Sequence, residues 1–407
     1  MRIFLFTHNF PPESNACSVR AFEHAKIWST EDDVIVFTAF PNFPEGVIYQ
    51  GYKNRLISNE MYKNVHVVRT LSFPVKNSGL ILRTCSFVFQ AMSTLTGALF
   101  QRKADVVIGS SPQFFIAIAA FLYARIKKSY FVFEVRDLWP QAIVEVGALK
   151  KGILVKQLEK IERFLYRRAD KIVVVSNSFK QKIIEKGIPE EKINVIFNGA
   201  NLDKFKPMTK AETLMKQHRL NGKFIVGYIG TMGMAHNLNS ILDIASLLIE
   251  DKNICFLFVG EGAEKQSLIE RAEREGLDNV VFLSKVNYEQ IEQYWSLLDI
   301  TIISWKDEKV FSLMLPAKMF ESIAMGKPII LSAPTGEAAS LMNDNGLGIH
   351  VLPGDSRSLL YSIRKMREGS VREVYANQCL KGAIRFSRQN LALEMQDALK
   401  SMVTKHD

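Results

Sequence analysis

Residues 224–236 read FIVGYIGTMGMAH, and this stretch decides the fold. Its first six residues form an apolar run, which is typical of a strand buried in a parallel sheet. Gly230 and Gly233 come directly after the run, where glycines let backbone N–H groups approach a phosphate at the start of the next helix. The spacing does not match the GxGxxG fingerprint, and a plain tight turn is the alternative interpretation. The stretch predicts the first strand and loop of a Rossmann-like unit.

Short apolar runs alternate with longer amphipathic segments on both sides of this stretch. The alternation predicts two consecutive doubly wound α/β units, each with a parallel sheet covered on both faces. The pattern loosens over residues 198–219, and we expect a hinge at residues 201–209. The expected domains are residues 1–203, residues 204–385 and a C-terminal helix in residues 386–407. The expected strands are residues 2–6, 33–38, 65–69, 105–109, 130–134, 171–175, 193–196, 224–229, 254–259, 280–283, 300–303, 328–331 and 348–352.

The composition limits the classes of protein that fit. The chain has 407 residues, a net charge of +10 and four scattered cysteines without a CxxC pair. This length favours two or three domains, and the cysteine spacing argues against a disulfide framework or a structural zinc site. The sequence contains no P-loop, HExxH or GxSxG motif. The basic charge suits phosphorylated small molecules, nucleic acid or an anionic membrane alike.

Residues 80–100 form a long apolar stretch that is interrupted by Arg83, Gln90 and several hydroxyl side chains. A membrane-spanning helix needs about 20 predominantly apolar residues, and a charge inside it is unfavourable. The stretch therefore favours an amphipathic helix over a span. Such a helix either packs in the core or touches a bilayer surface.

The sequence LPAKMFE, residues 315–321, carries the strongest chemical signal. Pro316 suits the start of a helix, and Lys318 and Glu321 share one face of it because they are three residues apart. A lysine beside the positive end of a helix suits an anionic diphosphate, and a carboxylate one turn later can accept the two hydroxyl protons of a ribose. A surface ion pair is the alternative interpretation.

Further polar residues follow the predicted strands, where ligands bind in open α/β sheets. His236 ends the glycine loop and can donate a hydrogen bond to phosphates. In the first half of the chain, Arg136 and Asp137 follow a strand and are expected to line the facing wall of a cleft, unless they form a structural pair. The other candidate contacts for the nucleotide are Thr231, Gly260, Glu261, Lys306, Gly336 and Glu337.

These residues belong to blocks that together resemble the family 4 retaining glycosyltransferases of the GT-B fold. The resemblance spans nearly the whole chain and includes FPPESNACSVR, FEVRDLWPQAIVEVGAL, VGYIGTMGMAHNL and LPAKMFESIAMGKPII. Within the family, the sequence is similar to bacterial surface-polysaccharide enzymes such as the N-acetyl-L-fucosaminyl transferases. The resemblance implies two Rossmann-like domains with a cleft between them, the acceptor on the first domain and the nucleotide sugar on the second. It also implies that the last helix returns to the first domain.

The family pattern assigns roles to some residues and departs at others. Glu321 matches the second of two family glutamates and is expected to bind ribose, but the first glutamate is replaced by Leu313. Thr231 and His236 stand where many members have an Arg and a Lys that hold the diphosphate. The common His-Asp of the first domain reads Arg136-Asp137, which puts contact between a catalytic histidine and the transferred sugar in doubt.

The resemblance implies retaining transfer from a UDP-sugar, with the diphosphate as leaving group, Lys318, Glu321, Arg136 and Asp137 at the reaction centre, and no metal or other cofactor. It implies a polyprenyl-diphosphate-linked saccharide as acceptor, in capsule or O-antigen synthesis, and no nucleic-acid partner. Basic side chains near apolar helices would then meet the inner face of the cell membrane from the cytoplasm. These are Lys103, Arg125, Lys127 and Lys128. A UDP-sugar epimerase on the same fold and a catalytically silent scaffold are the alternative functions.

Overall fold

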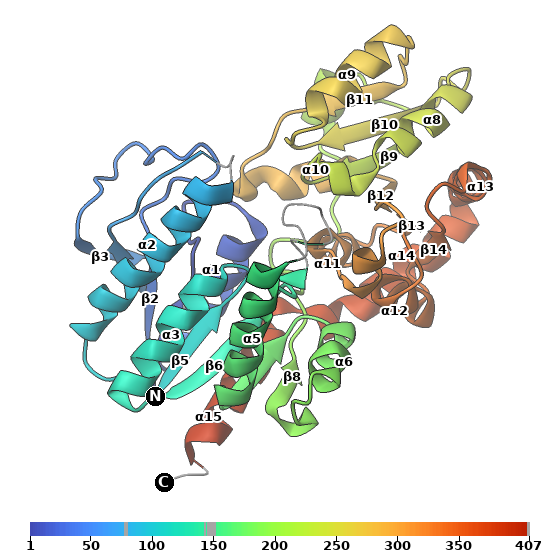
Figure 1. Ribbon diagram of the computed structural model, residues 1–407. Coiled ribbons are helices and arrows are strands. Elements are labelled where there is room, and N and C mark those ends of the chain that lie inside the picture. The colour runs from blue at the N-terminus through green and yellow to red at the C-terminus, as the bar shows by residue number, and fades with distance from the viewer. Residues whose placement is uncertain (77–79, 142–143, 145–151, 405–407) are drawn as a thin grey trace. The chain divides into compact units, whose positions relative to one another are not determined.

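The computed structural model describes residues 1–76, 80–141, 144 and 152–404, and it divides into two compact units (Figure 1). Unit 1 comprises Met1–Phe197 with Arg388–Asp407, and unit 2 comprises Asn198–Ser387. Part of the block FEVRDLWPQAIVEVGAL lies outside the described residues. Among the described helices, none has the length and apolar content that crossing a membrane requires.

Unit 1 is built on an eight-stranded sheet in the order β3-β4-β2-β1-β5-β6-β7-β8. All neighbouring strands pair in parallel except β3, which pairs antiparallel with β4 at the edge. From β1 the chain first adds strands on one side of the sheet and then, from β5 on, adds them on the other side. The position between β1 and β5 is therefore the topological switch point of this sheet. The strands are β1 (Arg2–Phe6), β2 (Asp33–Ala39), β3 (Ile57–Tyr62), β4 (Val65–Thr70), β5 (Val106–Ser110), β6 (Tyr130–Val135), β7 (Lys171–Val174) and β8 (Ile193–Val195).

Helices cover this sheet, and the last helix of the chain belongs to unit 1. The helices are α1 (Ala16–Trp28), α2 (Leu80–Leu99), α3 (Phe114–Lys127), α5 (Ile153–Arg168), α6 (Asn177–Glu185) and α15 (Arg388–Thr404). Helix α15 lies against α1, where the indole Nε1 of Trp28 donates to the Ala392 carbonyl at 2.8 Å. The apolar period of α15 therefore has a partner, because Leu391, Met395 and Leu399 are buried in the same core as β1 and β2.

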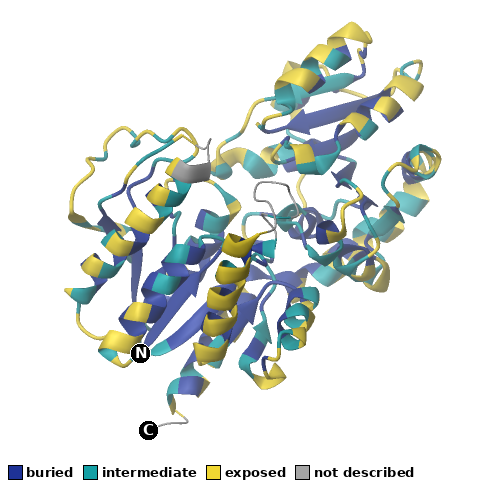
Figure 2. Ribbon diagram, viewed as in Figure 1, coloured by how far each residue is buried: buried dark blue, intermediate teal, exposed yellow. Residues whose placement is uncertain are grey.

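Helix α2 is the long apolar stretch, and it is amphipathic as expected. It contacts α3, β2 and β4 through a face on which Gln90, Thr94 and Ala98 are buried. Leu82 and Met92 are exposed, and Figure 2 shows exposed residues along one side of α2.

Unit 2 is built on a six-stranded parallel sheet in the order β11-β10-β9-β12-β13-β14. The strands are β9 (Phe224–Ile229), β10 (Ile254–Val259), β11 (Val280–Leu283), β12 (Ile300–Ser304), β13 (Ile329–Ser332) and β14 (Gly348–Val351). The helices are α7 (Glu212–Gln217), α8 (Asn239–Leu247), α9 (Lys265–Arg274), α10 (Ile291–Leu297), α11 (Ala317–Ala324), α12 (Glu337–Asn345), α13 (Ser356–Arg367) and α14 (Gly369–Ala383). Strand order reverses between β9 and β12, so the ligand-binding position of such a sheet is outside their carboxyl ends.

Candidate functional site

Lys318 is the second residue of α11, and its ammonium group lies at the carboxyl end of β9. Its Nζ is 3.8 Å from the ring centre of Tyr228, and within the described part of the chain no atom accepts a hydrogen bond from it. Burial lowers the pKa of Lys318 to about 7, and the carboxylate of Glu321 offsets part of that effect. A buried cation without an acceptor is costly. An anion at this place would supply the missing acceptor.

Glycines make room for this arrangement at the ends of β9 and β10. A Cβ on Gly230 would lie 2.8 Å from the Nζ of Lys318, so a side chain there would displace the ammonium group. Gly260 has a φ of +151°, and a Cβ on it would lie 1.9 Å from the carbonyl oxygen of Gly230. The two loops can meet only because neither carries a side chain at these positions. In the glycine loop, the backbone thus comes close to Lys318 and to the neighbouring loop, which a plain tight turn would not require.

Helices α11 and α12, like α8, α9 and α10, begin at this edge of the sheet without a side-chain cap. No side chain caps α11, whose N-cap is Pro316, or α12, whose N-cap is Gly336. By contrast, Asp355 caps α13 through a bond from the Ser358 N–H at 2.9 Å. Helix N-termini without caps leave backbone N–H groups for water or a ligand, and their dipoles favour negative charge. The start of α11 therefore combines a helix dipole with the ammonium group of Lys318.

His236, predicted to donate a hydrogen bond to the phosphates, lies near Tyr228 and Lys318. Its ring centre lies 5.9 Å from that of Tyr228. Burial lowers the pKa of His236 to about 3, helped by the charge of Lys318, so the imidazole is neutral at physiological pH. The ring bonds to the backbone of Ser304 and Nδ1 has no partner, which leaves Nδ1 as an acceptor when Nε2 carries the proton. Nδ1 therefore suits a hydroxyl group better than a phosphate oxygen.

The lowered pKa of Lys318 predicts how nucleotide binding depends on pH. A diphosphate favours the ammonium form, which is present below pH about 7 and is lost as the pH rises. We expect the affinity for UDP to fall by up to about tenfold per pH unit above that value. Calorimetric titrations with UDP from pH 6 to pH 9 measure the slope. Lys318→Met is the control for the ionisation of UDP itself, and equal slopes in both proteins would contradict the prediction.

The other residues of unit 2 that were predicted to contact the nucleotide have different surroundings. Lys306 follows β12, and its N–H donates to the Ala235 carbonyl at 3.0 Å, which ties the end of β12 to the glycine loop. Glu261 is directed elsewhere, because its carboxylate pairs with Lys265 at 2.6 Å. Thr231 is exposed, and its carbonyl accepts the Tyr228 hydroxyl at 2.5 Å. Gly233 is the N-cap of the short 3-10 helix Met234–His236 that follows the loop.

Gly336 and Glu337 begin α12 at the end of β13. A Cβ on Gly336 would lie 2.0 Å from the carbonyl oxygen of Ser312, so this glycine allows the loop before α11 to pack against α12. That loop includes the 3-10 helix Lys309–Leu313, in which Leu313 occupies the position of the first family glutamate. Glu337 lies in the first turn of α12, where a carboxylate is favourable next to the helix dipole.

Three polar residues around the Lys318 and His236 side chains were missed by the sequence analysis. The Tyr228 ring lies under the ammonium group of Lys318, and burial followed by the charge of Glu264 raises the pKa of Tyr228 well above the usual range. Within the described residues, one carboxylate oxygen of Glu264 and the hydroxyl of Ser304 are buried without a hydrogen-bond partner. Ser304 and Tyr228 lie in apolar strand runs, where sequence alone gives no sign that a polar group faces a site.

Arg136 and Asp137 follow β6 in unit 1, where Arg136 contacts the start of α1 while its buried Nε has no hydrogen-bond partner among the described residues. Its guanidinium donates to the carbonyls of Ala16 and Cys17 at 3.3 and 3.4 Å, and its N–H bonds to the hydroxyl of Ser111 at 2.7 Å. Burial raises the pKa of Asp137 to about 6, although Arg136 opposes the rise.

The described residues contain no group of three or more His, Cys, Asp or Glu side chains that could hold a metal ion. In unit 2, the negative charge of a diphosphate would be offset by the ammonium group of Lys318 and by the N-termini of α11 and α12.

Comparison with known proteins agrees with this division of the chain. Residues 210–379 match the model of the glycosyl transferases group 1, and residues 31–204 match that of Glycosyltransferase Family 4. Both models describe glycosyltransferases. The region that matches the group 1 model contains the Lys318 site, and the region that matches the family 4 model contains Arg136 and Asp137.

Relatives of both regions are found in bacteria. The putative colanic acid biosynthesis glycosyl transferase WcaI of Escherichia coli K12 is 25% identical over 402 residues, which covers 93% of this chain and 96% of WcaI. The probable glycosyltransferase WbjE of Pseudomonas aeruginosa is 25% identical over 303 residues, with 73% of this chain and 75% of WbjE covered.

Solved structures show that the two regions have the GT-B fold. Sucrose-phosphate synthase from Thermosynechococcus elongatus matches with a TM-score of 0.78 at 15% identity over 99% of both chains. HepE from Anabaena, in complex with UDP and glucose, matches with a TM-score of 0.72 at 17% identity over 98% of this chain and 100% of HepE. At these identities the likeness concerns the fold.

Proposed function

We propose that the chain transfers a sugar from a UDP-sugar, with retention of anomeric configuration, to a lipid-linked saccharide. The observation that carries the proposal is the buried ammonium group of Lys318, which has no acceptor among the described residues and lies at the uncapped start of α11. Glu321 lies one turn later on the same helix, where a ribose would follow a diphosphate. The complexes of HepE with UDP and with UDP-glucose support a UDP-sugar as the donor.

In the proposed transfer, the protein has to stabilise the leaving diphosphate and does not have to supply a nucleophile of its own. As the bond from the anomeric carbon to the diphosphate breaks, its electron pair goes to the phosphate oxygen, and negative charge grows there. The Lys318 ammonium and the dipole of α11 stabilise that charge. The acceptor oxygen bonds to the anomeric carbon from the same face, and its proton moves to the departing phosphate. No metal is needed in this scheme.

The setting we propose is the synthesis of a bacterial surface polysaccharide, capsule or O-antigen. The support is the name of WcaI, which refers to colanic acid biosynthesis. A polyprenyl-diphosphate saccharide is the proposed acceptor, and UDP-N-acetyl-L-fucosamine is the first donor to test. The enzyme would work in the cytoplasm at the inner face of the cell membrane, with Lys103, Arg125, Lys127 and Lys128 toward anionic lipid.

A transfer assay tests the proposal. Candidate UDP-sugars are incubated with and without a lipid-linked saccharide, and the products are followed by NMR. We expect a glycoside with the anomeric configuration of the donor, formed only with the acceptor. An epimer formed from the UDP-sugar alone would instead show an epimerase. The presence of Leu313 in place of a glutamate favours a silent scaffold as the second candidate, and absence of nucleotide binding by calorimetry would support it.

A further inference from the structure

Unit 1 contains a cavity of about 490 Å³ at the amino edge of its sheet, away from Arg136 and Asp137. Asp105 precedes β5, Tyr130 begins β6, and Asp170 precedes β7, so the cavity lies where these strands start. The carboxyl ends of the same strands hold the candidate residues of unit 1. A ligand in this cavity would therefore occupy a separate site.

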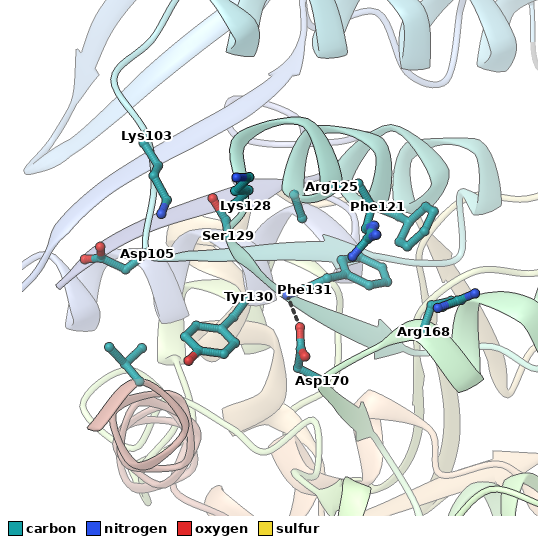
Figure 3. A pocket seen from close by; sticks show the side chains of 12 residues that line it. Lys103, Asp105, Phe121, Arg125, Lys128, Ser129, Tyr130, Phe131, Arg168 and Asp170 are labelled. Atoms are coloured by element: carbon teal, nitrogen blue, oxygen red, sulfur yellow. Dashed lines mark hydrogen bonds between the residues drawn. The ribbon is translucent and has the colours of Figure 1, made fainter. Parts of the chain in front are cut away.

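Four cationic side chains line this cavity (Figure 3). Lys103 comes from the loop before β5, Arg125 and Lys128 come from the end of α3, and Arg168 comes from the end of α5. Among the ion pairs of the described residues, none involves any of these four side chains. The guanidinium carbon of Arg168 lies 5.6 Å from the centre of the Phe164 ring, so this cation has an aromatic contact and no carboxylate partner among the described residues.

The two carboxylates of the cavity are already engaged by backbone donors. Asp170 accepts the N–H of Phe131 at 2.7 Å, and Asp105 accepts the N–H of Arg2 at 2.7 Å. The hydroxyl of Ser129 donates to the Ala104 carbonyl at 2.6 Å. The C-terminal ends of α3 and α5 also carry partial negative charge, and this charge neutralises part of the positive charge of the four cations. Four cations against two engaged carboxylates still leave an excess of positive charge.

Lys128, the C-cap residue of α3, lines the cavity. Lys128 ends α3 in the left-handed region, with φ of 54° and ψ of 53°. Glycine or asparagine is usual there, because other side chains are strained in this conformation. The conformation keeps a lysine at the cavity where a glycine would be more favourable.

The helices that end at the cavity carry exposed apolar side chains. Leu122 and Ile126 of α3 are 42% and 59% exposed, and they alternate with Arg125 on the outer face of that helix. Phe164 of α5 is 44% exposed and its ring centre lies 5.4 Å from that of Phe121, which lines the cavity. Figure 2 shows the exposed outer face of α5. Exposed apolar side chains beside the site would contribute nothing to binding a soluble phosphate, whereas they can insert into a membrane when the phosphate belongs to a lipid.

We propose that this cavity binds the phosphate monoester headgroup of an anionic membrane lipid while Leu122, Ile126 and Phe164 enter the bilayer interface. The inference deepens the proposed membrane contact and rests on it. The proposal replaces a diffuse electrostatic attraction by a specific headgroup site. Arg168 belongs to this site, and Lys127 does not, because it does not line the cavity. A monoester offers three terminal oxygens and up to two charges, which suits several converging cations.

Vesicle flotation tests the site. Phosphatidylcholine vesicles contain either phosphatidic acid, a monoester, or phosphatidylglycerol, a diester, at mole fractions that give equal surface charge. We expect the intact protein to bind both and to prefer phosphatidic acid about tenfold. Arg168→Gln and Lys128→Gln should abolish the preference. Lys127→Gln, the matched control on the same helix, should weaken binding to both lipids by about fivefold, the effect of one basic residue near the surface.

The outcomes separate the two proposals. Binding to both vesicles without a preference, or equal effects of Arg168→Gln and Lys127→Gln, would overturn the headgroup site and leave the diffuse contact. Binding to neither vesicle would overturn the membrane contact itself. Titration with inorganic phosphate alone forms the last arm. Tight binding of free phosphate by a protein that does not float would assign the cavity to a soluble ligand and contradict the lipid site.

Discussion

Replacing Lys318 with methionine lowers kcat for sugar transfer by about 10² to 10³, which corresponds to about 3 to 4 kcal/mol of transition-state stabilisation. The ammonium group is buried, has no acceptor among the described residues, and lies at the start of α11. In such a place an ion is effective because little water screens it and its position is fixed. Methionine keeps the length and the contact with the Tyr228 ring but removes the charge.

The measurement is the steady-state rate of transfer at pH 6.5, where wild-type Lys318 is largely protonated. Lys252→Met is the matched control, because Lys252 is an exposed lysine just before β10, at the opposite edge of the same sheet. Its kcat should stay unchanged. Glu321→Ala should also abolish transfer with the fold intact. A Lys318→Met enzyme that keeps more than a third of the wild-type kcat would remove Lys318 from the reaction centre.

Replacing Arg20 with methionine destabilises unit 1 by about 3 to 5 kcal/mol, the usual effect of removing one partner of a buried ion pair. Arg20 of α1 donates to Glu134 of β6 at 2.9 Å and to the carbonyls of Phe197 and Ile196 at 2.6 and 3.2 Å. Burial alone would raise the pKa of Glu134, but Arg20 and Arg136 hold it below the usual range. Without Arg20, Glu134 loses that compensation while Ile196 and Phe197 lose a donor.

Urea unfolding measures the change. Lys182→Met is the control, because Lys182 pairs with Glu185 on an exposed helix surface at 2.7 Å and such pairs contribute at most about 1 kcal/mol. The double variant Arg20→Met/Glu134→Leu should regain much of the lost stability, since a buried ion pair can be replaced by apolar groups at little cost. A loss below 1 kcal/mol for Arg20→Met would show that the pair does not hold the unit together.

The periodicity of the sequence predicted the strands well because both sheets are mostly parallel and buried. The runs at residues 224–229, 254–259 and 280–283 match β9, β10 and β11 residue for residue. Strand β3 was missed, since it lies at the sheet edge and its sequence ISNEMY is half-exposed throughout. Helix α13 was missed because its apolar positions lie among charged side chains, and α14 was missed because its sequence has no clear helical apolar period.

The site could be predicted only as far as local sequence determines it. The proline, lysine and glutamate of LPAKMFE indicate a helix start, and α11 begins at Ala317. The lowered pKa of Lys318 could not be predicted, because it depends on the burial of the ammonium group in the folded chain, where it lies over the Tyr228 ring of β9. The same holds for the acceptor character of His236 Nδ1, which follows from a bond to the backbone of Ser304.

Hydrogen exchange measured with and without UDP tests most directly whether the nucleotide lies at the start of α11. The account predicts that UDP slows exchange in residues 230–237 and 316–320, and that Lys318→Met reduces this protection. Protection confined to other parts of the chain, such as the basic cavity of unit 1, would contradict it.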